Sequence, residues 1–505
     1  MSFANKLIQA FLKPNLERAE FSRNYPDETQ FKVFNYLIKK AANTEFGKKY
    51  SFNELLGIGP SEFSRRVPLS TYEGLKPYIE RVAKGEKNIL WPNKTKWFAM
   101  SSGTTDARSK YIPITNDSLY KCHFEVGQQA LAVLGHNYPN NAAFTGKALA
   151  IGGSRQINKL GENAFCGDLS AVLISNLPLW AAMKRVPARE IALMESWDDK
   201  IEKMAHAVIK ENVTSISGVP SWTLVLFRKI LEITGKDNIS QIWPNLELFW
   251  HGGVNFKPYR SQYEKLIANP RMVYMETYNA SEGYFAFQDN PNSDDMLLIL
   301  DAGIYYEFIP MSDFDSPNRQ AIPLCDVKTD VNYAMVISTN GGLWRYIIGD
   351  TVKFTSLRPY KIKITGRTKY YINAFGEELV DDNAARAIRV ASQLANCDVK
   401  EYTAAPVYMN ANERGRHQWL IEFNIPPDDI DKFARALDSE LKRLNSDYEA
   451  KRYKDISLTG PEITIARENL FYDWLKEKGR LGGQNKVPRL SNNRNIIDEL
   501  LEMNA

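Results

Sequence analysis

The stretch Leu246-Glu247-Leu248-Phe249-Trp250-His251-Gly252-Gly253 is an apolar run that ends in a histidine and two glycines. This pattern predicts a buried strand that stops at a turn. Further strands are predicted from 214 and at 272–278, and helices at 222–234 and 258–268 separate the strands. Strands that alternate with single helices predict parallel βαβ units, and therefore an α/β fold.

Polar residues follow two of these predicted strands. In open parallel sheets, ligands bind beyond the carboxyl ends of the strands. The two segments predicted to lie there are His251-Gly252-Gly253 and Asn279-Ala280-Ser281-Glu282-Gly283. A histidine at a strand end is more often structural than catalytic, so His251 is expected to be structural, with a contact to substrate as the alternative.

A cluster of hydroxyl residues stands between two predicted strands, 96–100 and 110–114. It reads Ser101-Ser102-Gly103-Thr104-Thr105-Asp106-Ala107-Arg108-Ser109-Lys110. Gly103 allows a sharp bend, and the hydroxyls with Lys110 could hold phosphate oxygens. The spacing differs from a Walker motif. From this stretch alone, a phosphate loop and an ordinary Ser/Thr-rich turn are about equally supported.

The remaining pattern predicts two domains. Amphipathic helices are expected at 3–23 and 29–42, short helices broken by Pro68 and Pro77 at 60–85, and a helix at 117–134. Residues 296–365 predict a barrel-like antiparallel unit. The pattern changes near 366–369 to a small α+β set. We therefore expect a large N-terminal domain, 1–366, made of helix-flanked β-sheets plus the barrel-like unit, and a small mobile C-terminal domain, 367–505.

Composition narrows the class of protein. The 505 residues carry 64 Lys+Arg and 60 Asp+Glu, a net charge of +4, which supports no strong nucleic-acid or membrane-surface interaction. Four separated cysteines suggest neither a disulfide framework nor a zinc ribbon. Free thiols favour the cytoplasm. No apolar run is long enough to span a bilayer, and the N-terminus lacks a secretory signal.

Five motifs in order resemble the Gretchen Hagen family of acyl-acid amido synthetases, within the adenylate-forming superfamily. They span nearly the whole chain: Ser101 to Lys110 with the following Tyr-Ile-Pro, Tyr278 to Phe285, Ala302 to Pro310, Gly342 to Tyr346 with Gly349-Asp350, and Gly483 to Arg489. Two features depart from the family: Ala107 replaces a usual glycine, and Gly366-Arg367-Thr368 is closer to the wider superfamily. The chain looks like a bacterial-type member, so a plant-hormone substrate is not inherited.

The resemblance implies a reaction that uses ATP and Mg²⁺. The carboxylate of an acid would attack the α-phosphorus of ATP and expel pyrophosphate to give an acyl-adenylate. An amine, expected to be an amino acid, would then attack the acyl carbon and release AMP to form the amide. The implied catalytic residues are Lys110, Glu282 and Lys486, with Glu282 as the Mg²⁺ ligand. The implied nucleotide-binding residues are Ser101, Ser102, Gly103, Thr104, Thr105, Gly252, Gly253, Tyr278, Ser281, Asp350 and Arg367.

Individual roles follow from side-chain chemistry. Asp350 suits the ribose hydroxyls, Tyr278 could stack on adenine, and Arg367 could bind ribose or phosphate. Alternatively, Asp350 could be an ordinary turn residue and Tyr278 a core aromatic. Arg367 could equally form a surface salt bridge. The acid is expected to contact helices that carry Tyr120, Phe124 and Trp180. Two other functions stay open: a ligase that transfers the acyl group to coenzyme A, and a non-catalytic binding protein on the same scaffold.

Overall fold

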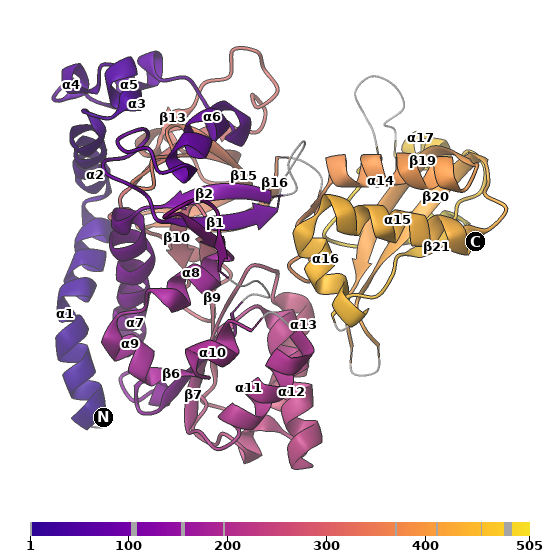
Figure 1. The fold of residues 1–505 in the computed structure, drawn as a ribbon, viewed down its shortest axis with the longest axis horizontal. Coiled ribbons are helices and arrows are strands. Elements are labelled where there is room, and N and C mark those ends of the chain that lie inside the picture. Colours follow the sequence, from indigo (N-terminus) through magenta and orange to yellow (C-terminus); the bar gives the residue numbers. More distant parts are fainter. Residues whose placement is uncertain are drawn as a thin grey trace.

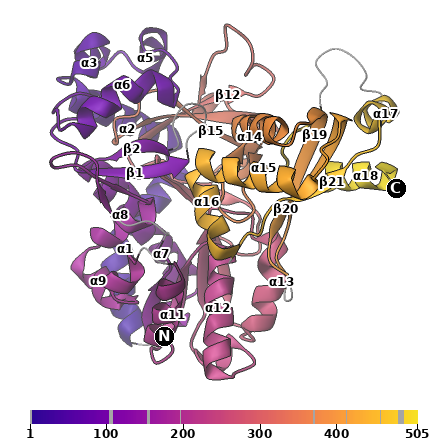
Figure 2. The same cartoon turned by 45° about the vertical axis from the view of Figure 1, so that its right-hand side comes forward.

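The protein was analysed as a computed structural model that describes residues 3–102, 109–152, 157–194, 197–368, 371–410, 413–455, 457–478 and 487–504. Figure 1 shows a larger N-terminal part, which carries the long helices α1 and α7, and a C-terminal group of helices and strands beside it. The turned view in Figure 2 brings the C-terminal group forward, with α16 near β1.

One twelve-stranded sheet organises the N-terminal part, in the order β13-β12-β14-β15-β16-β11-β10-β9-β8-β7-β3-β6. Its strands are β3 Lys147–Ala150, β6 Arg185–Val186, β7 Val213–Gly218, β8 Leu248–Gly252, β9 Val273–Ala280, β10 Gly283–Phe287, β11 Met296–Leu298, β12 Ile304–Pro310, β13 Ile322–Pro323, β14 Asn332–Thr339, β15 Tyr346–Leu357 and β16 Tyr360–Arg367. Strands β6, β3, β7, β8 and β9 are parallel. The predicted βαβ units are therefore confirmed.

From β9 onward the neighbours in this sheet are antiparallel. The predicted barrel-like unit is thus continuous with the parallel strands through β10 and β11, instead of forming a sheet of its own. This continuity matters for the site, because it places the end of β9 beside the hairpin of β15 and β16.

Helices cover the N-terminal sheet. They are α1 Phe3–Asn24, α2 Pro26–Ala41, α3 Glu45–Lys49, α4 Phe52–Leu55, α5 Pro60–Arg66, α6 Tyr72–Ala83, α7 Glu125–Asn137, α8 Leu169–Ser175, α9 Leu179–Lys184, α10 Arg189–Ala192, α11 Trp197–Val208, α12 Pro220–Thr234 and α13 Lys257–Leu266, together with a π-helical turn, η1, at Ser118–Phe124. Helix α12 begins at Pro220 and ends before Gly235, whose φ of 62° closes the last turn. Pro77 was expected to break a helix, but it lies inside α6.

A second, four-stranded sheet holds the predicted loop strands, in the order β2-β1-β5-β4. Its strands are β1 Trp97–Ser102, β2 Ser109–Ile114, β4 Asn158–Lys159 and β5 Phe165–Gly167. Strands β1 and β2 form an antiparallel hairpin in which Ser101 pairs with Lys110. The two strands predicted around the Ser/Thr cluster are therefore present.

The C-terminal part is α+β, as predicted. It consists of β17 Tyr371–Ile372, β18 Leu379–Val380, α14 Asp381–Leu394, β19 Asp398–Val407, β20 Arg416–Ile425, α15 Ile430–Leu444, α16 Ser446–Arg452, β21 Glu462–Ile465, α17 Leu470–Glu477 and α18 Asn495–Asn504.

The C-terminal part is docked on helices α12 and α13. The hydroxyl of Tyr259 donates to the carbonyl of Ala374 at 2.7 Å, and Gln262 donates to the carbonyl of Met409 at 2.9 Å. Arg228 donates to the carbonyl of Asn410 at 2.7 Å. Apolar residues of both parts share one hydrophobic cluster. In this orientation the two parts are joined by buried contacts.

Candidate active site

A cavity of about 920 Å³ opens at the ends of β8 and β9, between the β15–β16 hairpin and the start of the C-terminal part. Most predicted site residues that the structure describes line this cavity: Ser101, Lys110, Gly253, Tyr278, Ser281, Glu282, Asp350 and Arg367. Residues from four separate stretches of sequence therefore meet in one place. The volume is in the range of small-molecule sites.

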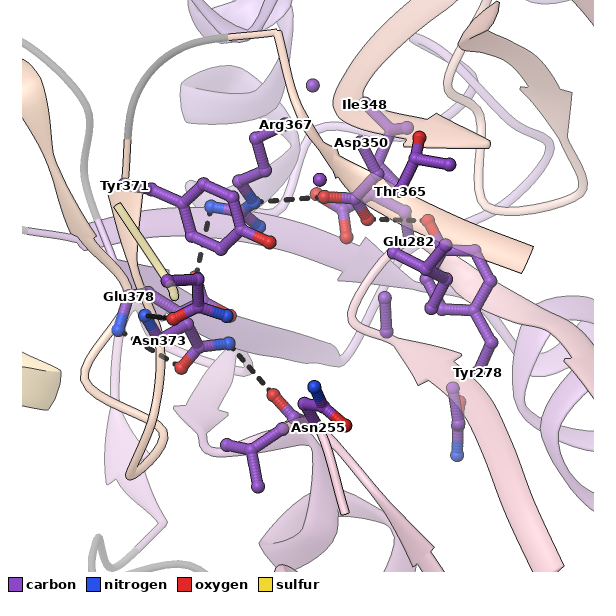
Figure 3. Close-up of a pocket in the computed structure, with 18 of the residues that line it drawn as sticks. Asn255, Tyr278, Glu282, Ile348, Asp350, Thr365, Arg367, Tyr371, Asn373 and Glu378 are labelled. Carbon is purple, nitrogen blue, oxygen red and sulfur yellow. Dashed lines mark hydrogen bonds and ion pairs between the residues drawn. The ribbon is translucent and has the colours of Figure 1, made fainter. Parts of the chain in front are cut away.

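Asp350 is the centre of a hydrogen-bond network in this cavity (Figure 3). The buried hydroxyl of Tyr278 donates to Oδ2 of Asp350 at 2.5 Å, and Nε of Arg367 donates to Oδ1 at 2.9 Å. Arg367 also lies 3.7 Å from a carboxylate oxygen of Glu378. Burial works to lower the pKa of Arg367, but the carboxylates of Glu378 and Asp350 outweigh it and raise that pKa. The guanidinium stays charged, and Asp350 is held in one orientation.

Lys110 and Glu282 form the other charged group of the cavity. Burial lowers the pKa of Lys110, while the nearby carboxylate of Glu282 opposes this effect. Burial raises the pKa of Glu282 to about 7, and the ammonium of Lys110 opposes the rise. At neutral pH, Glu282 is therefore close to its titration midpoint. A cation bound beside it would favour the ionised form.

Glu276 is another acid in the cavity, and the sequence did not single it out. It lies two residues before Tyr278 on β9. Burial raises its pKa to about 7, the charge of Asp294 adds to the rise, and Lys257 opposes it. Its position in an alternating strand was visible in the sequence, but its burial depends on the segments that close over it.

His251 lines the cavity but is held as a core residue. Its ring stacks on Phe256 with centroids 4.1 Å apart and is 3% exposed. Burial lowers its pKa to about 3, so the imidazole is neutral at physiological pH. This environment supports the structural interpretation.

Several expected positions are not in the cavity. A Cβ on Gly252 would lie 2.4 Å from the carbonyl oxygen of Thr277, so this glycine allows β8 and β9 to approach. Among the acyl-pocket candidates, Tyr120 and Trp180 are 48% and 39% exposed, and Phe124 packs against the hydrophobic core. None of the three lines the cavity. Aromatic residues at helical spacing were weak signals because cores use the same spacing.

Other predicted roles change or lie outside the described residues. The ring of Tyr278 packs on Phe285 at 4.8 Å and is only 6% exposed, which leaves little surface for stacking on a base. Its hydroxyl orients Asp350 instead. Gly103, Thr104, Thr105 and Lys486, as well as the side chain of Ser102, lie outside the part of the chain that the structure describes.

Arg345 shows that one motif serves two purposes. Its guanidinium is buried against the carboxylate of Glu307, with Nη2 to Oε1 at 2.9 Å, and donates to the carbonyls of Ser64 and Val67 at 2.7 Å. The Gly-Leu-Trp-Arg-Tyr element therefore anchors α5 to the sheet, while Asp350 four residues after Tyr346 faces the cavity.

Like Glu276, three further cavity residues were not singled out in the sequence: Tyr371, Asn373 and Glu378. Asn373 donates to the carbonyl of Gly253 at 2.8 Å, which ties the start of the C-terminal part to the end of β8. Glu378 has a φ of 42°. An acidic residue after a glycine and another glutamate is ordinary loop composition, so the sequence offered no signal for it.

The described residues contain no group of three or more His, Cys, Asp or Glu side chains arranged to hold a metal ion. Glu282 therefore lines the cavity without belonging to such a preformed cluster among these residues. This fits Mg²⁺, which proteins often bind through one or two carboxylates together with substrate phosphates. In the same described ranges, no helix has the length and apolar character needed to cross a membrane.

Comparison with solved structures identifies the fold. The structure of AtGH3.15 acyl acid amido synthetase in complex with 2,4-DB superposes with a TM-score of 0.61 at 17% identity, covering 99% of this chain and 96% of the other. A 2-hydroxyisobutyryl-CoA ligase superposes with a TM-score of 0.55 at 11% identity, covering 95% and 92%. Both likenesses show that this chain shares the fold of these two enzymes.

Sequence comparison then identifies the family. The models of the GH3 family N-terminal, central and C-terminal domains match residues 15–272, 297–367 and 382–495. Indole-3-acetic acid-amido synthetase GH3.3 of Arabidopsis thaliana is 24% identical over 93% of this chain and 90% of the relative. Jasmonoyl–L-amino acid synthetase JAR4 of Nicotiana attenuata is 20% identical over 97% and 96%. The chain belongs to the GH3 family.

Proposed function

We propose that this protein is an ATP-dependent acyl-acid amido synthetase that activates a carboxylic acid as its acyl-adenylate and transfers the acyl group to an amino acid. The observation that carries the proposal is the meeting of Asp350, Arg367, Glu282 and Lys110 in one cavity of a GH3-family chain. The names of the curated relatives, which are amido synthetases and a benzoate–glutamate ligase, support the same chemistry.

Asp350 would bind the ribose of ATP. Tyr278 and Arg367 each use one oxygen of its carboxylate, and each oxygen keeps a second lone pair that can accept a hydrogen bond. The two ribose hydroxyls could therefore donate to a carboxylate that is already oriented. Pre-orientation reduces the entropy lost on binding.

Lys110, Glu282 and the Ser/Thr loop would serve the phosphates. Phosphoryl transfer needs positioning and charge neutralisation more than covalent catalysis. Lys110 supplies a positive charge, and Glu282 would hold Mg²⁺. When bound, Mg²⁺ neutralises phosphate charge. The buried surroundings of both side chains strengthen their electrostatic interactions with bound phosphate.

Residues 1–366 and 367–505 would act as separate domains, and Lys486 would reach the reacting carboxylate when the small domain rotates. Supporting this, the pattern changes near 366–369 and β16 ends at Arg367. All four cysteines are free thiols, which supports a reducing, cytoplasmic location. Transfer to coenzyme A is the second candidate, favoured by the likeness to the 2-hydroxyisobutyryl-CoA ligase fold.

A pyrophosphate-exchange screen over carboxylic acids tests the first step. We expect acid-dependent exchange with ATP and Mg²⁺, followed by amide formation when amino acids are supplied. Thioester formation with coenzyme A in place of amide would select the second candidate. Absence of exchange with every acid, while ATP still binds, would support a non-catalytic binding protein.

Glu282→Gln tests the metal role separately from catalysis. ATP with Mg²⁺ should raise the melting temperature of the wild type, because a ligand of the folded state stabilises it. The variant should lose the Mg²⁺-dependent part of this rise and retain the part due to ATP alone. An unchanged Mg²⁺ dependence would remove Glu282 from the metal site.

A further inference from the structure

Asn279 lies in the cavity between Tyr278 and Glu282, yet none of the roles above uses it. As the next residue along β9, it points to the opposite face of the sheet from Tyr278. That face is covered by η1 and α7. Met100 of β1 and Leu169 at the start of α8 also line the cavity, and with Ala280 they pack against the hydrophobic cluster that contains Cys122. This end of the cavity is more apolar than the end with Asp350.

His123 fixes the side chain of Asn279. Nδ1 of the imidazole lies 3.0 Å from Oδ1 of Asn279, and the ring is 3% exposed. Because an amide oxygen only accepts, Nδ1 must carry the hydrogen. Nε2 is buried and has no partner among the described residues. Burial lowers the pKa of His123 to about 4, so the ring is neutral and Nε2 carries only a lone pair.

The reversed arrangement is less stable. If Asn279 turned its Nδ2 toward the ring, Nδ1 would accept and Nε2 would carry a buried N–H with no acceptor in the described structure. Orphaned buried N–H groups are rare because they cost more than under-used acceptors. The pair therefore favours one orientation, with Oδ1 toward His123 and Nδ2 free to donate elsewhere.

The π-helical turn η1 places His123 against the hairpin formed by β9 and β10. Its residues Cys122 and His123 contact a cross-strand pair of β9 and β10: the backbone N–H of Tyr284 donates to Sγ of Cys122 at 3.2 Å, and Tyr284 lies opposite Asn279. The register of the two strands shifts just after Tyr284. Both π-turns and such irregular pairings recur at functional sites.

Resting on the proposed function, we propose that Asn279 is a specificity-determining residue for the carboxylic acid, with His123 as its positioning residue. The Nδ2 group of Asn279 donates a hydrogen bond to an acceptor oxygen on the acyl part of the acid. The preferred acids are therefore mainly apolar molecules with one hydroxyl, ether or carbonyl oxygen near the activated carboxylate.

The test uses pyrophosphate exchange by the full-length protein with acids offered in pairs that differ only by a hydroxyl in place of a methyl group. The wild type should prefer the hydroxyl acid in kcat/KM by roughly 10-fold or more, the value of one well-made buried hydrogen bond. Asn279→Leu, which keeps the size but loses the donor, should bring the ratio to about one. ATP binding, followed by thermal shift, should not change.

His123 is tested by two substitutions. His123→Asn places a donor, Nδ2, at the position of imidazole Nδ1 and should keep most of the preference, whereas His123→Phe should lose it because the amide can then turn. Tyr120→Phe, on the exposed side of the same π-turn, is the matched control and should behave as wild type.

The outcomes separate this inference from the proposed function. The role of Asn279 would be overturned if the wild type showed similar kcat/KM values for the hydroxyl acid and the methyl acid. It would also be overturned if Asn279→Leu kept the wild-type ratio of these two values. In both cases the proposed function would stand. A His123→Phe variant that lowers kcat/KM equally for both acids would show that His123 is only structural. Absence of exchange with every acid would overturn both proposals.

Discussion

Asp350 carries the strongest expectation for a single side chain. Its carboxylate is held from two sides by Tyr278 and Arg367. Asp350→Ala should weaken ATP binding by roughly 10²-fold and erase the preference for ATP over 2′-deoxy-ATP, because the analogue already leaves the carboxylate partly unpaired. Calorimetric titration with both nucleotides measures the two effects.

Tyr278→Phe separates orientation from contact. It should weaken ATP binding by roughly 10-fold while some preference over 2′-deoxy-ATP survives, since the carboxylate is still held by Arg367. The matched control is Tyr306→Phe, which removes a buried hydroxyl that donates to the carbonyl of Ile299 away from the cavity. If the Asp350→Ala variant preferred ATP over 2′-deoxy-ATP as strongly as the wild type does, Asp350 would not bind the ribose.

Glu276 should make the folded protein less stable as the pH rises. Its pKa in the folded state is about 7, above the ordinary value of 4.5, so the folded state binds more protons than the unfolded state between these values. The stabilising contribution is present below pH 4.5 and is lost as the pH rises through 7. Glu276→Gln should therefore raise the unfolding free energy at pH 8 by roughly 1–2 kcal/mol, less than the full shift implies because the group is partly hydrated.

Denaturant unfolding of both proteins at pH 5.5 and pH 8 checks this expectation. The gain from Glu276→Gln should be larger at pH 8. Glu264→Gln on the exposed face of α13 is the control and should change little at either pH. A gain that is the same at both pH values would mean that Glu276 titrates normally.

The pairing of β8 with β9 depends on Gly252. A Cβ there would meet a backbone carbonyl at 2.4 Å, which cannot move without disturbing the ladder. Gly252→Ala should lower the unfolding free energy by roughly 2–4 kcal/mol and distort the cavity. Gly127→Ala in α7, where a Cβ would meet nothing within 4 Å, should instead stabilise by roughly 0.5–1 kcal/mol.

Thermal unfolding measures both effects: the melting temperature should fall in Gly252→Ala and rise in Gly127→Ala. If the Gly252→Ala variant had the same melting temperature as the wild type, the close approach of β8 and β9 would not need a glycine at this position. The contrast also separates two roles of Gly252, because a glycine that serves only the implied nucleotide binding would weaken ATP binding on substitution and spare stability.

Particular residues show what could be predicted from the sequence. Alternating strands and helices around Leu248 and Tyr274 predicted the parallel sheet, because local periodicity carries that information. The motif positions predicted that Lys110, Glu282 and Asp350 would meet. The partners of Asp350 could not be predicted, because Tyr278 lies 72 residues away in sequence and only tertiary structure brings it close. The place of Pro77 inside α6 also depends on tertiary structure, because packing of the helix outweighs the one hydrogen bond that the proline removes.

Burial was the other property that the sequence did not carry. Glu276 and Glu378 have ordinary sequence surroundings, and their roles in the cavity arise from segments that fold over them. Tyr120 and Trp180 show the opposite case, because both were expected to contact the acid but are exposed and do not line the cavity.

The relation between the two halves of the molecule bears on Lys486. Rotation of the C-terminal part would have to break the hydrogen bonds from Tyr259, Gln262 and Arg228. We expect that ATP and the acid together provide this free energy. Lys486→Ala should then reduce acid-dependent pyrophosphate exchange by ~10²–10³-fold, the usual cost of losing one preorganised donor.

The second half-reaction provides the contrast. Attack of an amino acid on a chemically prepared acyl-adenylate should be largely spared in Lys486→Ala, because it would use another orientation of the small domain. Arg489→Ala, three residues further on, is the control and should leave exchange within a few-fold of wild type. If Lys486→Ala exchanged pyrophosphate at the wild-type rate, Lys486 would have no role in the first step, and rotation of the C-terminal part would not be needed to explain that step.

The two edges of the twelve-stranded sheet have a consequence for how the protein behaves at high concentration. A wide sheet ordinarily exposes two rows of unpaired backbone groups on which another copy can add a strand. Here the outermost strands, β13 and β6, are each two residues long, and β13 ends in a proline that has no N–H to donate. The outermost strands of this sheet therefore offer only short templates, so we expect that addition of another strand to either of them is disfavoured.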